Sequence, residues 1–419
     1  MANSCYNFEV LSLKYLDFID LNYKPKETDV ICVFNVESEG VSIKEAAGAI
    51  AAESSIGTWT ELATEKEYVK KLAACAFSIE DSKVKIAYPI ELFEFGNIPN
   101  ILSSIAGNIF GLKTLRNLRL NDVYFPLKLI ESFKGPKFGI EGVRNLLKVY
   151  DRPLVGTIIK PKLGLKTDDH AKVAYEAWIG GCDIVKDDEN LSNQKFNPFK
   201  ERVLKTLKSR DEAEEETGER KVYMVNITAE TKEMLKRAKY VLTHGGEYVM
   251  VDILTCGFAA LQTLRNQDFN LVIHAHRAGH AALTKNPFHG ISMKVIAKIA
   301  RIIGVDQLHV GTVVGKMFET KEEVMENCEA LKMEMGKLKP VLPVASGGLH
   351  PGLIPALIQF FGKDVVIQAG GGIHGHKNGT VAGAKAMRQA IEATLKGISL
   401  TEYAETHIEL KEALETWKL

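Results

Sequence analysis

A lysine followed by three acidic residues forms the most reactive stretch of the sequence, Lys186-Asp187-Asp188-Glu189. The stretch ends a short apolar run, and in an extended strand Lys186 and Asp188 point to the same side. Carboxylates grouped at a strand end suit a hard cation such as magnesium, which prefers oxygen ligands. A lysine buried beside them can lose its proton and react as a free amine. A salt-bridged surface loop is the alternative, and the lysine next to the apolar run favours a site.

Basic side chains end two other apolar runs. Lys160 and Lys162 are two residues apart, so they are expected to share one face of a strand. His274 and His276 also share a face, and Arg277 follows them. Satisfied core histidines are the alternative for this pair, but the arginine next to them suits bidentate phosphate binding.

Glycine-rich segments follow the last three apolar runs. Lys316, which follows Gly311 and Gly315, is typical of a mobile lid that carries a charge. Glycines also follow Ser346 and occupy residues 370–372, where backbone N–H groups can approach an anion closely. Together these segments indicate one cation and at least one phosphate. That combination fits enolate chemistry on a phosphorylated sugar, with the metal polarising a carbonyl.

A repeating unit positions these residues. From about residue 136 onward, short apolar runs with strand character alternate with amphipathic helical stretches, which predicts parallel strands joined by right-handed crossovers. Eight units favour a closed (βα)8 TIM barrel, whose functional groups gather at the C-terminal ends of the strands. An open doubly wound sheet is the alternative. The eight predicted strands span residues 154–162, 182–189, 221–229, 248–256, 271–278, 307–312, 341–348 and 365–372.

The first part of the chain has no such repeat. It predicts a smaller α+β domain over residues 1–135, followed by the catalytic barrel over residues 136–419. Strands are expected at 29–36 and 83–88, and helices at 42–54 and 98–113. Ser42 and Glu45 have the spacing of a capping box at the start of the first helix.

Composition excludes several classes of protein. Lys+Arg and Asp+Glu are equal at 53 each, so no net field attracts nucleic acid or an anionic membrane. No apolar run reaches the ~18 residues of a membrane span, and the N-terminus does not have the pattern of a signal peptide. The six cysteines form no CxxC pair, which favours reduced thiols and a cytoplasmic location.

Two motifs carry a resemblance to a known family. Gly-Thr-Ile-Ile-Lys-Pro-Lys-Leu-Gly at 156–164 and Gly-Gly-Cys-Asp-Ile-Val-Lys-Asp-Asp-Glu-Asn at 180–190 resemble the large subunit of ribulose-1,5-bisphosphate carboxylase/oxygenase (RuBisCO). About ten motifs match in order over nearly the whole chain, and they are most similar to the archaeal-type (form III) branch. Ile158 departs from the substrate-contacting threonine of many carboxylases.

The resemblance implies an activity and its cofactors. The expected reaction converts ribulose 1,5-bisphosphate, CO2 and water to two 3-phosphoglycerates, with competing oxygenation. It proceeds through a magnesium-bound enediolate in these enzymes, and form III members are linked to AMP and nucleotide salvage. Lys186 matches the lysine that takes up an activating CO2 as a carbamate, which holds Mg2+ together with Asp188 and Glu189. Lys160, supported by Lys162, matches the lysine of enolisation and product protonation.

The remaining roles implied by the resemblance concern proton transfer and substrate binding. His276 matches a histidine of the proton transfers, and Lys316 matches the loop lysine that stabilises the adding CO2. Substrate-binding roles fall on Arg277, His309, Ser346, Gly347, Gly348, Gly370 and Gly371 in the barrel and on Glu53, Thr58, Trp59 and Asn108 in the first domain.

In this family the first-domain residues reach into the neighbouring subunit's barrel. The resemblance therefore implies a homodimer or an assembly of dimers, without a small subunit. The alternative is a RuBisCO-like enolase or isomerase that acts on a phosphorylated thiosugar. Such relatives usually lose several substrate residues, which are all present in this chain.

Overall fold

The computed structural model describes residues 15–60, 62–315 and 318–417. Contacts within the chain divide the described residues into two compact units. The first contains the residues up to Phe133 together with Gly279–Ile299 and Met335–Lys337, and the second contains the remainder. No helix in the described part of the chain is both long and apolar enough to span a membrane.

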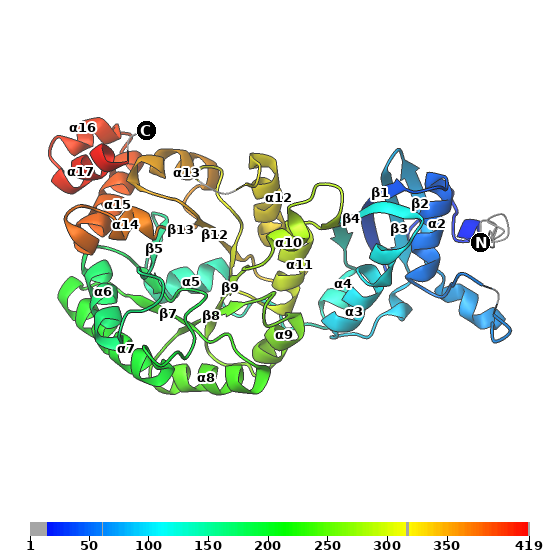
Figure 1. The fold of residues 1–419 in the computed structure, drawn as a ribbon, viewed down its shortest axis with the longest axis horizontal. Coiled ribbons are helices and arrows are strands. Elements are labelled where there is room, and N and C mark those ends of the chain that lie inside the picture. Colours follow the sequence, from blue (N-terminus) through cyan, green and yellow to red (C-terminus); the bar gives the residue numbers. More distant parts are fainter. Residues whose placement is uncertain (1–14, 61, 316–317, 418–419) are drawn as a thin grey trace, which may run out of the picture. The chain divides into compact units, whose positions relative to one another are not determined.

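A five-stranded sheet forms the first unit, with the order β10-β4-β1-β3-β2. The central strand β1 pairs antiparallel with both β3 and β4, and β10 pairs parallel with β4. Helix α2 packs against β1 and β2 (Figure 1). The strands are β1 (Val30–Ser38), β2 (Cys75–Glu80), β3 (Lys83–Tyr88), β4 (Leu115–Tyr124) and β10 (Gly290–Ile291). The helices are α2 (Ile43–Glu53), η1 (Glu67–Leu72), η2 (Ile90–Leu92), α3 (Ile98–Ile105), η3 (Asn108–Gly111), α4 (Leu127–Ile130) and α10 (Ala281–Thr284).

Local sequence signals explain where the helices of this unit begin and end. The capping box of α2 is confirmed, because Ser42 Oγ accepts from Glu45 N at 3.2 Å and Glu45 Oε2 accepts from Ser42 N at 2.7 Å. The prediction of one helix over 98–113 is wrong. The chain breaks into α3 and η3 at Gly107, where an added Cβ would lie 2.0 Å from the carbonyl oxygen of Ser103. Only glycine fits that turn, and the turn ends α3.

The second unit contains the predicted closed barrel of eight parallel strands, in the order β11-β12-β13-β5-β6-β7-β8-β9. Because the order follows the chain, each crossover joins neighbouring strands. The strands are β5 (Leu154–Ile158), β6 (Ile184–Lys186), β7 (Val222–Asn226), β8 (Tyr248–Asp252), β9 (Val272–His276), β11 (Gln307–His309), β12 (Leu342–Ser346) and β13 (Val366–Gln368).

The predicted strands run too far at their C-terminal ends. The prediction extended the first of them to Lys162, but β5 ends at Ile158 and a bend occupies residues 160–163. Lys160 and Lys162 therefore do not share a face of a strand, and that prediction is wrong. Lys160 and Lys162 belong to the loop after β5, whereas Lys186 and Asp252 are the last residues of their strands.

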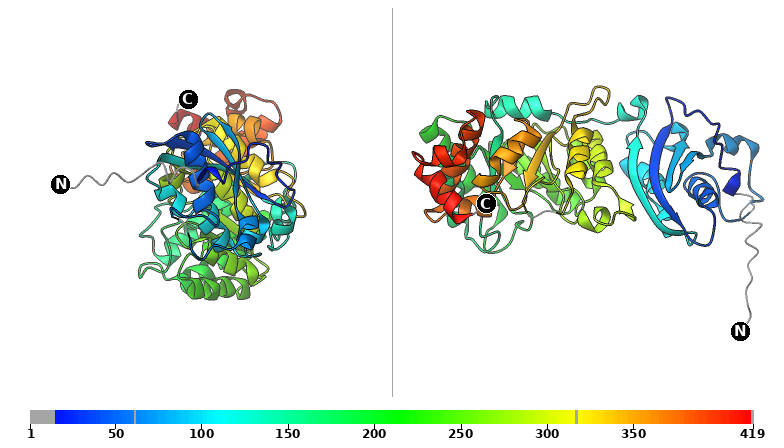
Figure 2. Two further views of the ribbon diagram at one scale, coloured as in Figure 1. Left: turned by 90° about the vertical axis from the view of Figure 1, so that its right-hand side faces the viewer. Right: turned by 90° about the horizontal axis from the view of Figure 1, so that it is seen from above.

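Helices surround the barrel, and α6, α7, α8 and α9 follow one another around its outside (Figure 1). The terminal helix α17 packs against α15 and α16 (Figure 2). The helices are α5 (Gly139–Leu147), α6 (Thr167–Ile179), α7 (Phe199–Thr217), α8 (Thr231–Thr243), α9 (Phe258–Asn266), α12 (Lys321–Lys332), η4 (Pro351–Leu353), α13 (Ile354–Phe361), α14 (Gly371–His374), α15 (Gly379–Leu395), α16 (Leu400–Ala404) and α17 (Ile408–Thr416). Helix α11 (Met293–Ile303) begins in the first unit and ends in the second.

An apolar cluster closes the N-terminal end of the barrel. Val143 and Leu147 of α5 pack there against the first residues of the strands, including Leu154, Ile184 and Val222. These side chains are almost completely buried. The packed base leaves the polar strand ends to the opposite mouth, as in other barrels of this type.

We expect Leu154→Ala to destabilise the barrel by about 2–5 kcal/mol, because the deletion leaves a cavity in this cluster. Urea unfolding followed by fluorescence measures the change. Leu204→Ala on α7 is the matched control, since Leu204 is 46% exposed and its truncation removes little buried surface. Equal shifts of the two variants would contradict the role of the basal cluster.

Candidate active site

The side chain of Lys186 lies at the end of β6 and is only 1% exposed. Its Nζ donates to the carbonyl oxygen of Asp187 at 2.9 Å and lies 3.2 Å from Met250 Sδ and 3.7 Å from Glu189 Oε2. Burial lowers the pKa of Lys186, and the carboxylates of Glu189 and Asp188 offset this only in part. A buried amine that is easily deprotonated is a nucleophile.

Asp188 follows on the same side of the strand end and is paired with Lys160. Lys160 Nζ donates to Asp188 Oδ2 at 2.9 Å, and Asn190 N donates to Asp188 Oδ1 at 3.2 Å. Burial raises the pKa of Asp188, but the hydrogen bond and positive charge of Lys160, together with the hydrogen bonds from Asn190, outweigh the burial, so the pKa lies below its ordinary value. The carboxylate is therefore ionised at neutral pH and available as an oxygen ligand.

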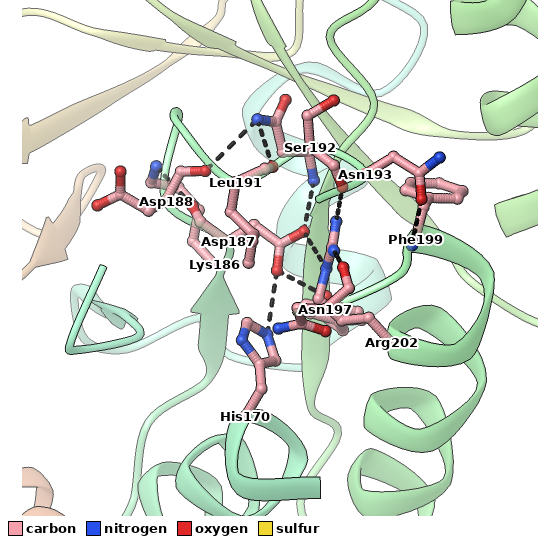
Figure 3. A network of polar contacts seen from close by, with 12 residues as sticks. His170, Lys186, Asp187, Asp188, Leu191, Ser192, Asn193, Asn197, Phe199 and Arg202 are labelled. Atoms are coloured by element: carbon pink, nitrogen blue, oxygen red, sulfur yellow. Dashed lines mark hydrogen bonds and ion pairs between the residues drawn. The ribbon is translucent and has the colours of Figure 1, made fainter. Parts of the chain in front are cut away.

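Between these two residues, Asp187 points the opposite way, into a buried polar network (Figure 3). Its carboxylate is completely buried and accepts from Tyr223 Oη at 2.6 Å, Asn226 N at 3.0 Å and Arg202 Nε at 3.3 Å. His170 Nε2 lies 3.2 Å from Asp187 Oδ1. Burial raises the pKa of Asp187, yet Arg202 and His170 more than compensate and hold it at about 2. This network fixes the strand end from outside, so that Lys186 and Asp188 face the other way.

Asn226, at the end of β7, holds the next part of the same loop. Its Nδ2 lies 3.4 Å from the carbonyl oxygen of Asp188 and 3.0 Å from those of Glu189 and Leu191. One amide group therefore restrains the backbone that carries both carboxylates. The oxygen atoms of Asp188 and Glu189 thus lie on a loop that is held from two sides.

Three histidines lie together at the ends of β9 and β11. His276 Nδ1 lies 2.5 Å from Asp252 Oδ1, because these residues face each other in the register of β8 and β9. His274 Nε2 lies 2.9 Å from His309 Nε2, and its Nδ1 lies 3.0 Å from Gln307 Oε1. Burial keeps the pKa values of His274 and His309 well below the ordinary value, so both rings are neutral.

Arg277 follows His276 and is paired with a carboxylate of the loop after β11. Its Nη2 lies 2.5 Å from Glu319 Oε1, with both side chains buried. Burial lowers the pKa of Arg277 despite this partner. The guanidinium nevertheless remains a cation, because an arginine stays charged in proteins.

Glycines follow the last two strands of the barrel. Gly347 and Gly348, after Ser346, have positive φ of 133° and 72°. A Cβ on Gly370 would lie 3.1 Å from Lys160 Cε, whereas one on Gly371 would meet nothing within 4 Å. A side chain at Gly370 would therefore crowd the lysine that pairs with Asp188.

The other predicted residues lie in the first unit or outside the described residues. Glu53 is the last residue of α2 and accepts from Tyr15 Oη at 2.9 Å. Thr58 and Trp59 follow it, with Trp59 66% exposed, and Asn108 is the first residue of η3. Lys316 lies outside the described residues. In the barrel, Lys162 is exposed after the strand end.

No group of three or more His, Cys, Asp or Glu side chains among the described residues has the arrangement of a metal site. The expected magnesium ligands include only two such residues, Asp188 and Glu189. Both lie beside the buried amine of Lys186, which would need to become an oxygen ligand to join them. The two carboxylates and the reactive amine fit the expected site.

Comparisons with known proteins agree with this arrangement. The family model for the ribulose bisphosphate carboxylase large chain, catalytic domain, matches residues 139–417, and the model for its N-terminal domain matches residues 17–129. The chain belongs to the RuBisCO large-chain family. The family and the barrel fold predicted from the sequence are therefore confirmed.

Similar relatives are archaeal enzymes named ribulose bisphosphate carboxylase. The protein of Methanocaldococcus jannaschii is 52% identical over 96% of this chain and 100% of its own length. The protein of Pyrococcus furiosus is 53% identical over 96% of this chain and 97% of its own length. An octameric Rubisco from Pyrococcus horikoshii superposes with a TM-score of 0.94 at 51% identity, covering 96% of each chain. A dimeric Rubisco from Hyperthermus butylicus superposes with a TM-score of 0.90 at 49% identity, covering 96% of this chain and 99% of its own chain.

Sequence reasoning missed three residues of the site. Asp252 and Asn226 end β8 and β7, two strand ends that drew no attention because they carry no cluster of charged residues. The rule that strand ends carry function would have found both. Glu319 had no signal, because its partner Arg277 lies 42 positions away in the chain.

We predict that Asp187→Asn lowers stability by about 2 kcal/mol at pH 6, because a pKa held at about 2 lies below the ordinary ~3.9 of an aspartate. The depressed pKa stabilises the folded state above pH ~4, and this contribution is lost as pH falls toward 2. Urea unfolding at a series of pH values measures the free energy of unfolding of wild type and variant. The difference between these two free energies should decrease as the pH falls from about 4 toward 2. Asp169→Asn, at an exposed position of α6, should show no such narrowing. A difference that is independent of pH would contradict the assignment.

Proposed function

We propose that the chain catalyses the carboxylation of ribulose 1,5-bisphosphate to two molecules of 3-phosphoglycerate, with competing oxygenation. The observation that carries the proposal is the buried amine of Lys186 beside Asp188 and Glu189 at the mouth of the barrel. Relatives about 50% identical over nearly the whole chain are named for this activity, which supports it.

Lys186 is the proposed site of activation. CO2 adds to its neutral amine, an N–C bond forms, and one proton is released, which leaves a carbamate. The modification replaces an amine by oxygen atoms, so that Lys186, Asp188 and Glu189 become a set of ligands for Mg2+. The low pKa of the buried amine favours the reaction, since a protonated amine cannot attack CO2. Bound magnesium supplies a Lewis acid that polarises a carbonyl.

Two further residues are proposed to move protons. Lys160 Nζ, which is paired with Asp188, holds a proton that can pass to the substrate. His276 is oriented by Asp252 through Nδ1, which leaves Nε2 for a substrate hydroxyl. The Lys186 carbamate is the proposed base for the C3 proton, and Lys316 is proposed to stabilise the adding CO2.

The substrate is proposed to bind through its two phosphates. Arg277 and His309 take one phosphate, and the backbone of Gly348, Gly370 and Gly371 takes the other. Ser346 and Gly347 lie on the loop after β12, beside the proposed sugar hydroxyls, and Lys162 supports Lys160.

Residues of the first unit complete the proposed site in a dimer. Glu53, Thr58, Trp59 and Asn108 would act in the neighbouring subunit's barrel, as the exposure of Trp59 allows. The structurally similar proteins are described as dimeric and octameric, which supports a homodimer or an assembly of dimers. A role in AMP or nucleotide salvage, in the cytoplasm, is proposed from the similarity to archaeal relatives.

Incubation with magnesium, labelled bicarbonate and ribulose 1,5-bisphosphate tests the activity. We expect acid-stable label in 3-phosphoglycerate. An intact protein that incorporates no label, but enolises a phosphorylated thiosugar, would overturn the proposal in favour of the enolase-type relatives.

We predict that Lys186→Ala and Lys186→Met abolish label incorporation at any magnesium concentration, because neither side chain can form a carbamate. The methionine variant keeps most of the buried volume, which separates the loss of the amine from a packing defect. Lys195→Ala, at an exposed position of the following loop, should remain active. Appreciable carboxylation by either Lys186 variant would contradict the role of the amine.

A further inference from the structure

The proposed phosphate-binding arginine already has an anionic partner within the chain. Arg277 and Glu319 form an ion pair of 2.5 Å with 6% and 3% of their side-chain surfaces exposed. Gly311 packs tightly against the pair, since a Cβ there would lie 3.3 Å from Glu319 Cδ and 3.4 Å from Arg277 Nη2. The charge of the guanidinium is thus offset at short range inside the protein.

The imidazole beside Arg277 adds no positive charge. Burial keeps the pKa of His309 well below its ordinary value, so this ring near Arg277 carries no charge. Arg277 Nη1, by contrast, is buried and has no hydrogen-bond partner among the described residues. A buried guanidinium nitrogen without a partner is costly, and a phosphate oxygen would satisfy it.

These two facts act in opposite directions on an anion. The unpartnered Nη1 attracts a phosphate, whereas Glu319, bound to Nη2 of the same guanidinium, repels it. A like charge so close to a dianion in a poorly solvated site lowers affinity strongly. The carboxylate of Glu319 therefore either lowers the affinity of the site for phosphate or must move away from Arg277 when phosphate binds.

We propose that Glu319 is a specificity-determining residue, an internal competitor that sets the affinity of the Arg277 subsite. Glu319 lowers the affinity of Arg277 for every phosphate group by the same factor. A single phosphate, as in inorganic phosphate or a monophosphate product, is then bound weakly. A bisphosphate that is anchored at a second point keeps a high effective concentration at Arg277 and binds despite the competitor. The bisphosphate part of this inference rests on the proposed function.

Binding of inorganic phosphate, measured by calorimetry on the full chain without magnesium, CO2 or sugar substrate, tests the proposal. We expect Glu319→Gln to lower the Kd of phosphate about tenfold or more, since the glutamine keeps the shape but loses the charge. Glu322→Gln, at an exposed position three residues on, removes the same charge and should leave the Kd unchanged. Glu319→Asp, whose shorter side chain retreats from Nη2, should give a smaller gain.

The double variant Arg277→Gln/Glu319→Gln shows whether the gain acts through Arg277, and we expect the gain to vanish. A Kd in Glu319→Gln that is unchanged or higher would overturn the proposal, because Glu319 would then only orient the arginine. A gain that survives in the double variant would overturn it as well. Label incorporation by wild type is a separate measurement, so tighter phosphate binding without carboxylation would refute the proposed function and leave this inference standing.

Discussion

The chemistry proposed for this barrel mouth depends on the burial of one amine, that of Lys186. Lys186 lies among apolar strand residues, where a positive charge is poorly solvated, and its nearest carboxylate oxygen is 3.7 Å away, too far for a strong ion pair. A closer carboxylate would stabilise the ammonium form and remove the nucleophile. For the proposed function, the same carboxylates must nevertheless be near enough to become metal ligands together with the proposed carbamate. The proposed site therefore depends on an intermediate distance between the amine and the carboxylates. The distance is too long for a strong ion pair but short enough for both groups to bind one metal ion.

That separation is maintained from outside the barrel. Successive side chains of a strand point to opposite faces, so Asp187 must point outward when Lys186 and Asp188 point inward. A buried outward carboxylate would be costly alone, but Arg202, Tyr223 and the backbone of Asn226 satisfy it. The outward network thus makes the inward direction of its two neighbours the stable one. Its loss would displace the reactive residues, although the side chains of Arg202 and Tyr223 bond to Asp187 and to neither Lys186 nor Asp188.

The sequence predicted the barrel well because parallel strands buried on both faces are continuous apolar runs, and these are easily counted. It predicted strand ends poorly, since polar residues such as Lys160 continue a strand pattern without its pairing. Single polar residues such as Asp252 gave too little signal to be noticed. The pair of Arg277 and Glu319 depends on the path of a loop between distant positions, which no local pattern encodes. Roles of individual residues came from the resemblance to a family, because spacing alone indicated only a cation and a phosphate.

Charge compensation unites the described residues of the site. Lys160 pairs with Asp188 and Arg277 pairs with Glu319, while the carboxylate of Asp252 lies against the ring of His276. A barrel mouth with several unpaired cations would be unstable by self-repulsion and would hold any passing anion. Pairing avoids both, but it makes substrate binding an exchange of partners rather than a simple attraction. Each phosphate or enolate oxygen of the proposed substrate must then bind its cation more strongly than the carboxylate does. A substrate with two phosphates and a metal-binding centre can do so at several points at once, and a smaller anion cannot.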